Sequence, residues 1–243
     1  MIGRFQTVLR LIYPPACLSC GGLVETELGL CAACWRETGF IGGLVCDLCG
    51  TPLPGQEASQ DMVHCDDCMT IARPWTRGRA ALLYKGTGRK LVLALKHGDR
   101  QDIVVPAAGW MAQAARPILK SGMLIAPVPL HWTRMLNRRY NQSALLSSRL
   151  ARNTGLDHCP DLLVRKKHTA SLDGAGRDAR FRMLNAAITV APSRRQKLHG
   201  RSILIVDDVM TSGATLAACA DACLIAGAAQ VFVLTLARVA KDA

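Results

Sequence analysis

"SILIVDDVMTSGATL", residues 202–216, is the stretch of sequence that decides the fold. Its first part is a short apolar run, which indicates a strand that is buried on both faces of a sheet. An alanine-rich helical stretch, residues 214–228, and a second apolar strand, residues 231–237, follow with short connections. This order of strand, helix and strand predicts an α/β fold in which helices cover both faces of a parallel sheet.

The chain before this stretch continues the same alternation. Residues 123–130 read as another buried strand, and residues 141–155 read as an amphipathic helix that a glycine ends. A further helix is expected over residues 102–122, with Asp102 as its N-terminal cap. Ligands bind parallel sheets beyond the carboxyl ends of the strands, so we expect a site in the loops that follow the apolar strands.

Two adjacent carboxylates, Asp207 and Asp208, follow the apolar run at its carboxyl end. Vicinal carboxylates accept hydrogen bonds from the two hydroxyl groups of a ribose diol. The next loop combines hydroxyl side chains, backbone N–H groups and the start of a helix, which together make a cradle for a phosphate. The loop residues are Thr211, Ser212, Gly213, Ala214 and Thr215. The stretch therefore predicts one site for a ribose and its 5′-phosphate.

This motif resembles that of the type I phosphoribosyltransferase family. There, an apolar strand, two acidic residues and a Thr/Ser-Gly-x-Thr loop hold phosphoribosyl pyrophosphate (PRPP), and Thr211-Ser212-Gly213 matches that loop. The resemblance implies a phosphoribosyltransferase-like parallel sheet and Mg²⁺ bound together with PRPP. A Mg²⁺ pocket of the receiver-domain type is an alternative for the two carboxylates. That domain needs further elements well downstream, however, and only 35 residues follow Asp208.

A basic loop follows the strand that is predicted over residues 123–130. It contains Arg134, Arg138 and Arg139, and arginine suits bidentate phosphate binding. The resemblance assigns this position to the second end of PRPP, so we expect these side chains to bind pyrophosphate or the phosphate backbone of DNA. A solvated basic loop is the alternative interpretation. Trp132, in the same loop, either stacks on a base or packs at the seam between two domains.

Eight of the 11 cysteines form four Cys-x-x-Cys units. The units are Cys17 with Cys20, Cys31 with Cys34, Cys46 with Cys49, and Cys65 with Cys68. A two-residue gap lets both sulfur atoms face one tetrahedral ion, so four units predict two closed, structural Cys₄ zinc sites. Pairing of consecutive units needs the shortest loops, and a crossed pairing or a ligand role for His64 stays open. A disulfide framework fits poorly, because the N-terminal stretch does not read as a secretion signal.

Charge divides the chain at the last Cys-x-x-Cys unit. Residues 1–76 carry four basic and eight acidic side chains, which leaves 26 basic and 10 acidic ones, a balance of +16, for residues 77–243. We therefore expect an N-terminal helix with a double zinc ribbon over 1–76 and a phosphoribosyltransferase-like domain over 77–243. The basic excess indicates a polyanionic partner. No apolar run is long enough to span a bilayer, and we expect a cytoplasmic protein.

The whole arrangement resembles the ComF family of competence-associated, phosphoribosyltransferase-like bacterial proteins. The resemblance rests on the paired zinc ribbons, the loop "VPLHWTRMLNRRYNQ" and the motif "VDDVMTSGAT", and it covers nearly the whole chain. Two positions depart from the family pattern. Arg139 replaces a frequent glycine, and Leu172 stands where a glutamine would follow Thr169 and Ser171. The second departure leaves the base or acceptor of any transfer reaction open.

The ComF resemblance implies a role in DNA uptake during natural transformation. The chain would bind PRPP or a related phosphoribosyl ligand, handle single-stranded DNA and contact other competence proteins, and a basic domain suits a single-stranded backbone. The alternative is an active PRPP-dependent phosphoribosyltransferase of nucleotide salvage or metabolism with an unknown acceptor. In that enzyme the carboxylates would hold the ribose while the basic loop stabilises the leaving pyrophosphate. No residue is assigned a catalytic role.

Overall fold

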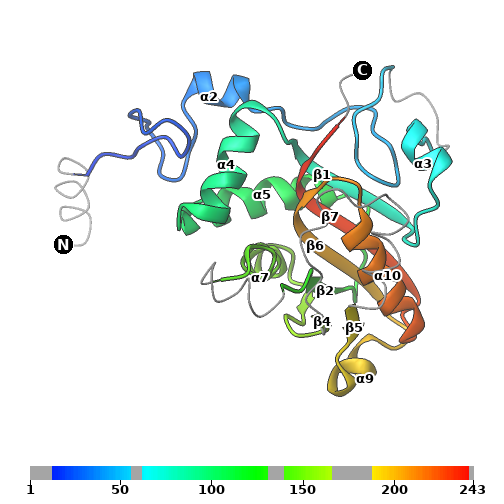
Figure 1. Ribbon diagram of the computed structural model, residues 1–243. Helices are drawn as coiled ribbons and strands as arrows, with labels where there is room; N and C mark the ends of the chain where they lie inside the picture. Colours follow the sequence, from blue (N-terminus) through cyan, green and yellow to red (C-terminus); the bar gives the residue numbers. More distant parts are fainter. Residues whose placement is uncertain (1–12, 56–61, 131–139, 166–187, 241–243) are drawn as a thin grey trace.

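The computed structural model describes residues 13–55, 62–130, 140–165 and 188–240. Its centre is a five-stranded, all-parallel sheet with the strand order β1-β7-β6-β2-β3 (Figure 1). The strands are β1 (Arg77–Leu83), β2 (Leu124–Pro127), β3 (Asp157–His158), β6 (Ser202–Met210) and β7 (Gln230–Arg238). The predicted α/β class with a parallel sheet is confirmed.

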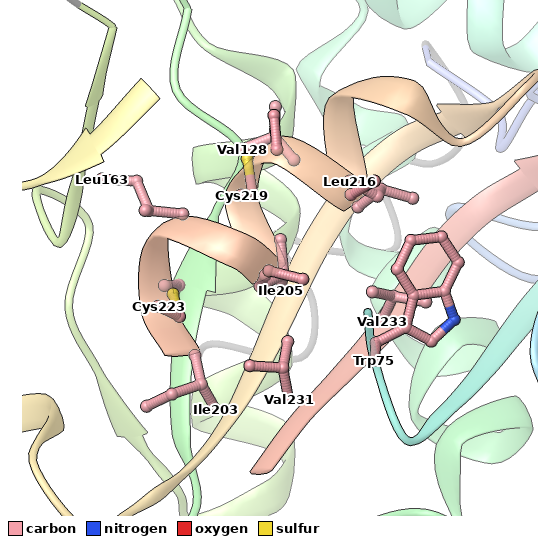
Figure 2. Close-up of a cluster of buried hydrophobic side chains, with 14 of the residues drawn as sticks. Trp75, Val128, Leu163, Ile203, Ile205, Leu216, Cys219, Cys223, Val231 and Val233 are labelled. Carbon is pink, nitrogen blue, oxygen red and sulfur yellow. The ribbon is translucent and has the colours of Figure 1, made fainter. Parts of the chain in front are cut away.

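Helices cover both faces of this sheet. One face carries α4 (Gly86–His97), α5 (Val104–Ala115) and α7 (Gln142–Thr154), and the other carries α10 (Ala214–Ile225) (Figure 1). Two buried apolar clusters lie on these faces because successive residues of a strand point to opposite sides. In β6, Leu204 and Val206 join the cluster of α4, α5 and α7, whereas Ile203 and Ile205 join that of α10 (Figure 2).

Smaller elements complete the C-terminal part. A two-stranded antiparallel sheet pairs β4 (Leu163–Arg165) with β5 (Ile188–Val190), and the short η2 (Pro192–Arg194) and α9 (Arg195–Leu198) lead into β6. The 3₁₀ turn η1 (Gln101–Ile103) precedes α5. None of the helices among the described residues is long and apolar enough to cross a membrane.

Three local predictions need correction. The strand of the opening motif does not end before the carboxylates, because β6 continues through Asp207 and Asp208 to Met210. The helix expected over 102–122 is shorter, since it begins after η1 and ends at Ala115, two residues before Pro117. Asp102 is not its cap and forms an ion pair with Arg100 instead. Residues 1–12, where the expected N-terminal helix would begin, lie outside the described residues.

The cysteine-rich region is attached to the sheet along the outer edge of β1. Its two short helices are α2 (Ala32–Glu37) and α3 (Asp66–Thr70). Between them, the Ile41 N–H donates to the Ala81 carbonyl at 2.9 Å, and the Leu83 N–H donates to the Gly39 carbonyl at 2.7 Å. The connection between the two cysteine clusters therefore pairs with the end of β1 through an isolated antiparallel β-bridge, Phe40 with Leu82.

A buried carboxylate anchors the second cysteine region to the same strand. Asp47 accepts hydrogen bonds from the guanidinium groups of Arg77 and Arg79, and its side chain is 7% exposed. Burial alone would raise the pKa of Asp47, but the hydrogen bonds from Arg79 and Arg77 lower it below its usual range. The Gly78 N–H also donates to the Asp47 carbonyl at 2.7 Å, so backbone and side chain hold the two segments together.

Substitution of Gly78 tests this close approach. A Cβ atom at Gly78 would collide with the Leu48 carbonyl oxygen and come within 2.8 Å of Val233 Cγ2. We expect Gly78→Ala to lower the free energy of unfolding by about 1–3 kcal/mol, the usual cost of overpacking. Gly109→Ala is the matched control, because nothing lies within 4 Å of its added Cβ and alanine favours the interior of α5. Equal urea midpoints for the two variants would contradict the prediction.

Candidate functional site

The loop between β6 and α10 forms a small cradle of about 40 Å³ at the carboxyl end of the sheet. The cradle is lined by Asp207 and residues 209–216, so the structure brings the predicted phosphate loop together with one of the two carboxylates. Gly213 caps α10 with φ of +81°, a left-handed conformation that favours glycine. The first-turn N–H groups of a 12-residue helix therefore open onto the cradle.

A buried arginine at the end of β7 supports the loop. Sequence analysis did not single out this residue. Arg238, at the end of β7, is 3% exposed, and its Nη1 donates to the carbonyl groups of Met210 and Thr211 at 3.2 and 2.6 Å. In a planar trans peptide the carbonyl and the following N–H point in opposite directions. Because Arg238 draws these two carbonyls inward, the N–H groups of Thr211 and Ser212 point outward. That orientation suits an anion in the cradle.

Asp207 lines the cradle and contacts the beginning of α7. Its Oδ1 accepts a hydrogen bond from Ser143 Oγ at 2.8 Å and another from the Asp208 N–H at 2.9 Å. Burial of the carboxyl group, together with the nearby charge of Asp208, raises its pKa to about 7. Asp207 therefore holds its proton far more readily than an exposed aspartate. Sequence analysis missed Ser143, and its place in the first turn after a capping asparagine was the available signal.

Asp208, the next residue of β6, contacts α4 instead. Its Oδ1 forms an ion pair with Lys96 Nζ at 3.0 Å, and both side chains are largely buried. Two further hydrogen bonds tie this end of α4 to the start of α7. Tyr140 Oη donates to the Leu95 carbonyl at 2.8 Å, and Gln142 Nε2 donates to the Lys96 carbonyl at 3.4 Å. Sequence analysis missed Lys96, because the contact depends on how α4 packs.

The basic loop with Arg134, Arg138 and Arg139, and Trp132 with it, lies outside the described residues. Its far end is anchored by Asn141, the cap of α7. Asn141 Oδ1 accepts from the N–H groups of Ser143 and Ala144, and its Nδ2 donates to the Val128 carbonyl at 3.1 Å. This contact brings the beginning of α7 next to the end of β2. The substituted segment with Thr169, Ser171 and Leu172 also lies outside the described residues.

The eight cysteines of the Cys-x-x-Cys units gather into two groups of four, and consecutive units pair. The groups are Cys17, Cys20, Cys31 and Cys34, and Cys46, Cys49, Cys65 and Cys68, with all sulfur atoms of a group within 4.8 Å of one another. The Cys20–Cys31 and Cys49–Cys65 sulfur pairs are 3.8 and 3.6 Å apart. Four sulfurs around zinc at about 2.3 Å lie about 3.8 Å apart, so both groups fit a tetrahedral ion.

The two cysteine groups differ in their surroundings. In the second group Cys46 and Cys49 are fully buried and belong to the apolar cluster of α10, whereas Cys20 of the first group is exposed. His64 is not a member of either group. Four thiolate ligands leave no open coordination position, so both sites are structural rather than catalytic.

A parallel sheet with a hydroxyl-rich loop after paired carboxylates, preceded by two Cys₄ sites, defines a phosphoribosyltransferase-like protein with a double zinc ribbon. Family comparisons agree, since the double zinc ribbon domain matches residues 8–69 and the phosphoribosyl transferase domain matches residues 150–243. DNA utilization protein YhgH of Salmonella typhimurium is 30% identical over 234 residues, which cover 94% of this chain and 99% of the relative. The chain belongs to the ComF family, as the sequence resemblance predicted.

Two other relatives carry competence names. Competence protein F of Haemophilus influenzae is 29% identical over 206 residues, 82% of this chain and 86% of the relative. Competence protein ComFC of Bacillus subtilis is 24% identical over 221 residues, 89% and 87% of the two chains.

Solved structures resemble the chain more distantly. Glutamine PRPP amidotransferase of B. subtilis matches 59% of this chain with a TM-score of 0.40 and 14% identity, and the match spans 30% of the amidotransferase. TT1426 of Thermus thermophilus matches 58% of this chain and 85% of its own, with a TM-score of 0.33 and 16% identity.

The pKa of Asp207 predicts a pH dependence of stability. Between the ordinary value of 3.8 and about 7, the folded protein binds a proton at Asp207 that the unfolded chain has released. The contribution of Asp207 to the free energy of unfolding therefore falls as the pH rises through this range. We expect the parent to lose stability relative to Asp207→Asn between pH 5 and pH 7, measured by urea unfolding. Asp157→Asn, at an exposed ion pair with Arg201, should follow the parent. A constant difference between Asp207→Asn and the parent would contradict the prediction.

Proposed function

We propose that this chain acts in DNA uptake or DNA utilisation and that its C-terminal domain binds PRPP or a related phosphoribosyl ligand. The observation that carries the proposal is the end of β6, where the carboxylate of Asp207 and an anion-binding loop share one cradle. The biological role rests on the ComF family and on the names of its members, which are competence and DNA utilization proteins. The phosphoribosyl ligand follows from the chemistry of the cradle.

In the proposed complex the 5′-phosphate lies on the loop of residues 211–215. The outward N–H groups of Thr211 and Ser212, the hydroxyl groups and the N-terminus of α10 bind its oxygens, which requires no rearrangement of the supported backbone. The ribose then extends along the end of β6, where Asp207 accepts hydrogen bonds from its hydroxyls. Asp208, the next residue, offers the same ribose a second acceptor, and Lys96 neutralises its charge before the ligand arrives.

The pyrophosphate end of the ligand would face the basic loop. Arg134, Arg138 and Arg139 follow β2, whose carboxyl end lies beside that of β6 in the sheet. Mg²⁺, when bound with PRPP, reduces the negative charge of the pyrophosphate oxygens. Guanidinium groups in this loop would complete the neutralisation in a bidentate manner.

Single-stranded DNA is the proposed macromolecular partner. The balance of +16 in residues 77–243 suits a polyphosphate backbone, and the arginine loop holds three arginines within residues 134–139. Pyrophosphate and a DNA backbone both present phosphate oxygens to the guanidinium groups of this loop. The two ligands should therefore compete for it.

An active PRPP-dependent phosphoribosyltransferase is the second candidate. It is favoured by the combination of acidic groups for the ribose and a separate cradle for the 5′-phosphate. In that reaction the bond between the ribose C1 and the pyrophosphate oxygen breaks, the pyrophosphate leaves with both bonding electrons, and a nucleophilic acceptor forms the new bond to C1. Release of pyrophosphate from PRPP in the presence of candidate bases distinguishes the enzyme from a binding protein.

Thermal unfolding with PRPP and Mg²⁺ tests ligand binding. A ligand at a hundred times its dissociation constant stabilises the folded state by about 2.7 kcal/mol, so the parent should melt several degrees higher. Asp208→Asn should lose most of this shift because it removes a charged acceptor for the ribose hydroxyls. The control is Asp161→Asn, at an exposed ion pair with Arg194 remote from the cradle in the chain. A parent with no shift at millimolar PRPP would rule out the phosphoribosyl site.

Fluorescence anisotropy with an oligo-dT strand tests DNA binding. We expect affinity to fall steeply with salt concentration, and Arg134→Glu with Arg138→Glu to weaken binding at least tenfold and to flatten the salt slope by about two. The control is Arg116→Glu, which reverses one charge at an exposed arginine after α5. Added PRPP should displace the strand. Unchanged affinity in the double variant would remove the loop from the DNA site.

A further inference from the structure

The segment that leaves the second cysteine group rests against the phosphate loop. Arg73 Nη1 donates to the Ser212 carbonyl at 2.7 Å. A Cβ atom on Gly213 would lie 2.9 Å from that nitrogen and 3.3 Å from the ring of Trp75. Figure 2 shows the Trp75 ring beside Leu216 of α10 and Val233 of β7. The turn of the loop is therefore seated directly on two side chains that precede β1.

Trp75 also contacts the second cysteine group. It is 3% exposed, and its Nε1 donates to the Leu48 carbonyl at 2.6 Å. Leu48 lies inside the unit that Cys46 and Cys49 bracket, so its carbonyl direction depends on the turn around their sulfurs. The Arg73 guanidinium lies over the Trp75 ring, with Cζ 5.4 Å from the ring centre. Trp75 thus links the cysteine turns to the loop directly, and Arg73 joins this contact through Trp75.

Arg73 completes the orientation of the loop that Arg238 begins. Arg238 holds the carbonyls of Met210 and Thr211, and Arg73 holds the next one, that of Ser212. By the geometry of the planar peptide, an inward Ser212 carbonyl turns the Gly213 N–H outward. Three consecutive N–H groups then face the cradle, and the third depends on a residue contributed by the zinc-ribbon side of the chain.

The first cysteine group is attached to another part of the molecule. Arg100 Nη2 donates to the Leu18 carbonyl at 3.4 Å, and Thr87 Oγ1 donates to Glu37 at 3.2 Å, so its described contacts are with α4 and the turn that follows. Arg100 and Thr87 belong to neither the phosphate loop nor α10. Loss of zinc from the second Cys₄ group would therefore disturb the phosphate loop, whereas loss from the first group would disturb the contacts with α4 and the turn that follows it.

We propose that Arg73 and Trp75 are positioning residues that make the phosphate loop depend on zinc at Cys46, Cys49, Cys65 and Cys68. Zinc fixes the cysteine turns, Trp75 rests on these turns, and Arg73 lies over the Trp75 ring. The pair then holds the peptide between Ser212 and Gly213 in its anion-binding orientation. The inference rests on the proposed function only in its consequence for ligand affinity. The support of the loop is a property of the protein alone.

Hydrogen exchange of the full chain, loaded with two zinc ions, tests the support directly. We expect Arg73→Met to raise the exchange rates of amides in residues 211–216 about tenfold while zinc content stays at two per chain. Arg73→Lys, which keeps a cationic donor, should restore part of the protection. Arg36→Met is the matched control, since Arg36 lies on α2 of the first cysteine group and donates to its own helix.

A pair of cysteine variants separates the two metal sites. Cys65→Ser and Cys31→Ser remove one partly buried ligand from the second and the first group respectively, and each should lose one zinc. Only Cys65→Ser should speed exchange in residues 211–216. If Cys65→Ser unfolds the whole sheet, so that β6 amides exchange as well, Arg73→Met alone decides, because it keeps both ions.

Ligand binding is measured on the same samples. If the parent binds PRPP with Mg²⁺, Arg73→Met should weaken the affinity about tenfold and Arg36→Met should not. If the parent binds no PRPP, the proposed function fails, and the exchange rates still decide whether Arg73 supports the loop. Exchange rates in Arg73→Met that equal those in Arg36→Met would overturn the proposal.

Discussion

Three consecutive carbonyl groups at the end of β6 accept hydrogen bonds from two arginine side chains, and the proposed anion-binding orientation of the loop depends on this constraint. A loop of hydroxyls and glycine has no fixed preference for the direction of its peptide groups. Arg238 and Arg73 supply that preference although they are far apart in the sequence. Arg238 ends β7, and Arg73 precedes β1. β1 and β7 are neighbours in the sheet, which explains how residues so distant in sequence reach the same turn.

The carboxylates depend on a related but separate arrangement. Because β6 continues to Met210, the strand holds both Asp207 and Asp208, and each meets its own partner. Ser143 and the backbone hold Asp207, whereas Lys96 compensates Asp208. The two groups are thus unequal despite their adjacency. One tends to keep its proton near neutral pH, and the other is held beside a cation.

Much of this structure follows from local sequence, and the remainder follows from contacts that local sequence does not contain. Apolar strands, the glycine turn at Gly213 and the spacing of the cysteines are short-range signals, and they predicted the parallel sheet, the phosphate loop and two Cys₄ groups. The extension of β6 was missed because acidic residues disfavour strands, and here pairing with β7 overrides that preference. The site also depends on contacts between residues that are far apart in the sequence, made by Lys96, Arg73 and Arg238. A motif within one stretch of sequence does not predict such contacts.

The β-bridge of residues 39–41 with β1 has a consequence for the two edges of the sheet. β3, at one edge, has only two residues, and so short a strand offers few free backbone groups with which another chain could pair. β1, at the other margin, is seven residues long and largely buried, and such a strand would be a template for another chain if its outer edge were free. Gly39 and Ile41 bond Ala81 and Leu83 at one end of that edge, and the Asp47 carbonyl accepts from the Gly78 N–H near the other end. The cysteine-rich polypeptide therefore occupies hydrogen-bonding groups with which the edge of β1 would otherwise pair with another copy of the chain.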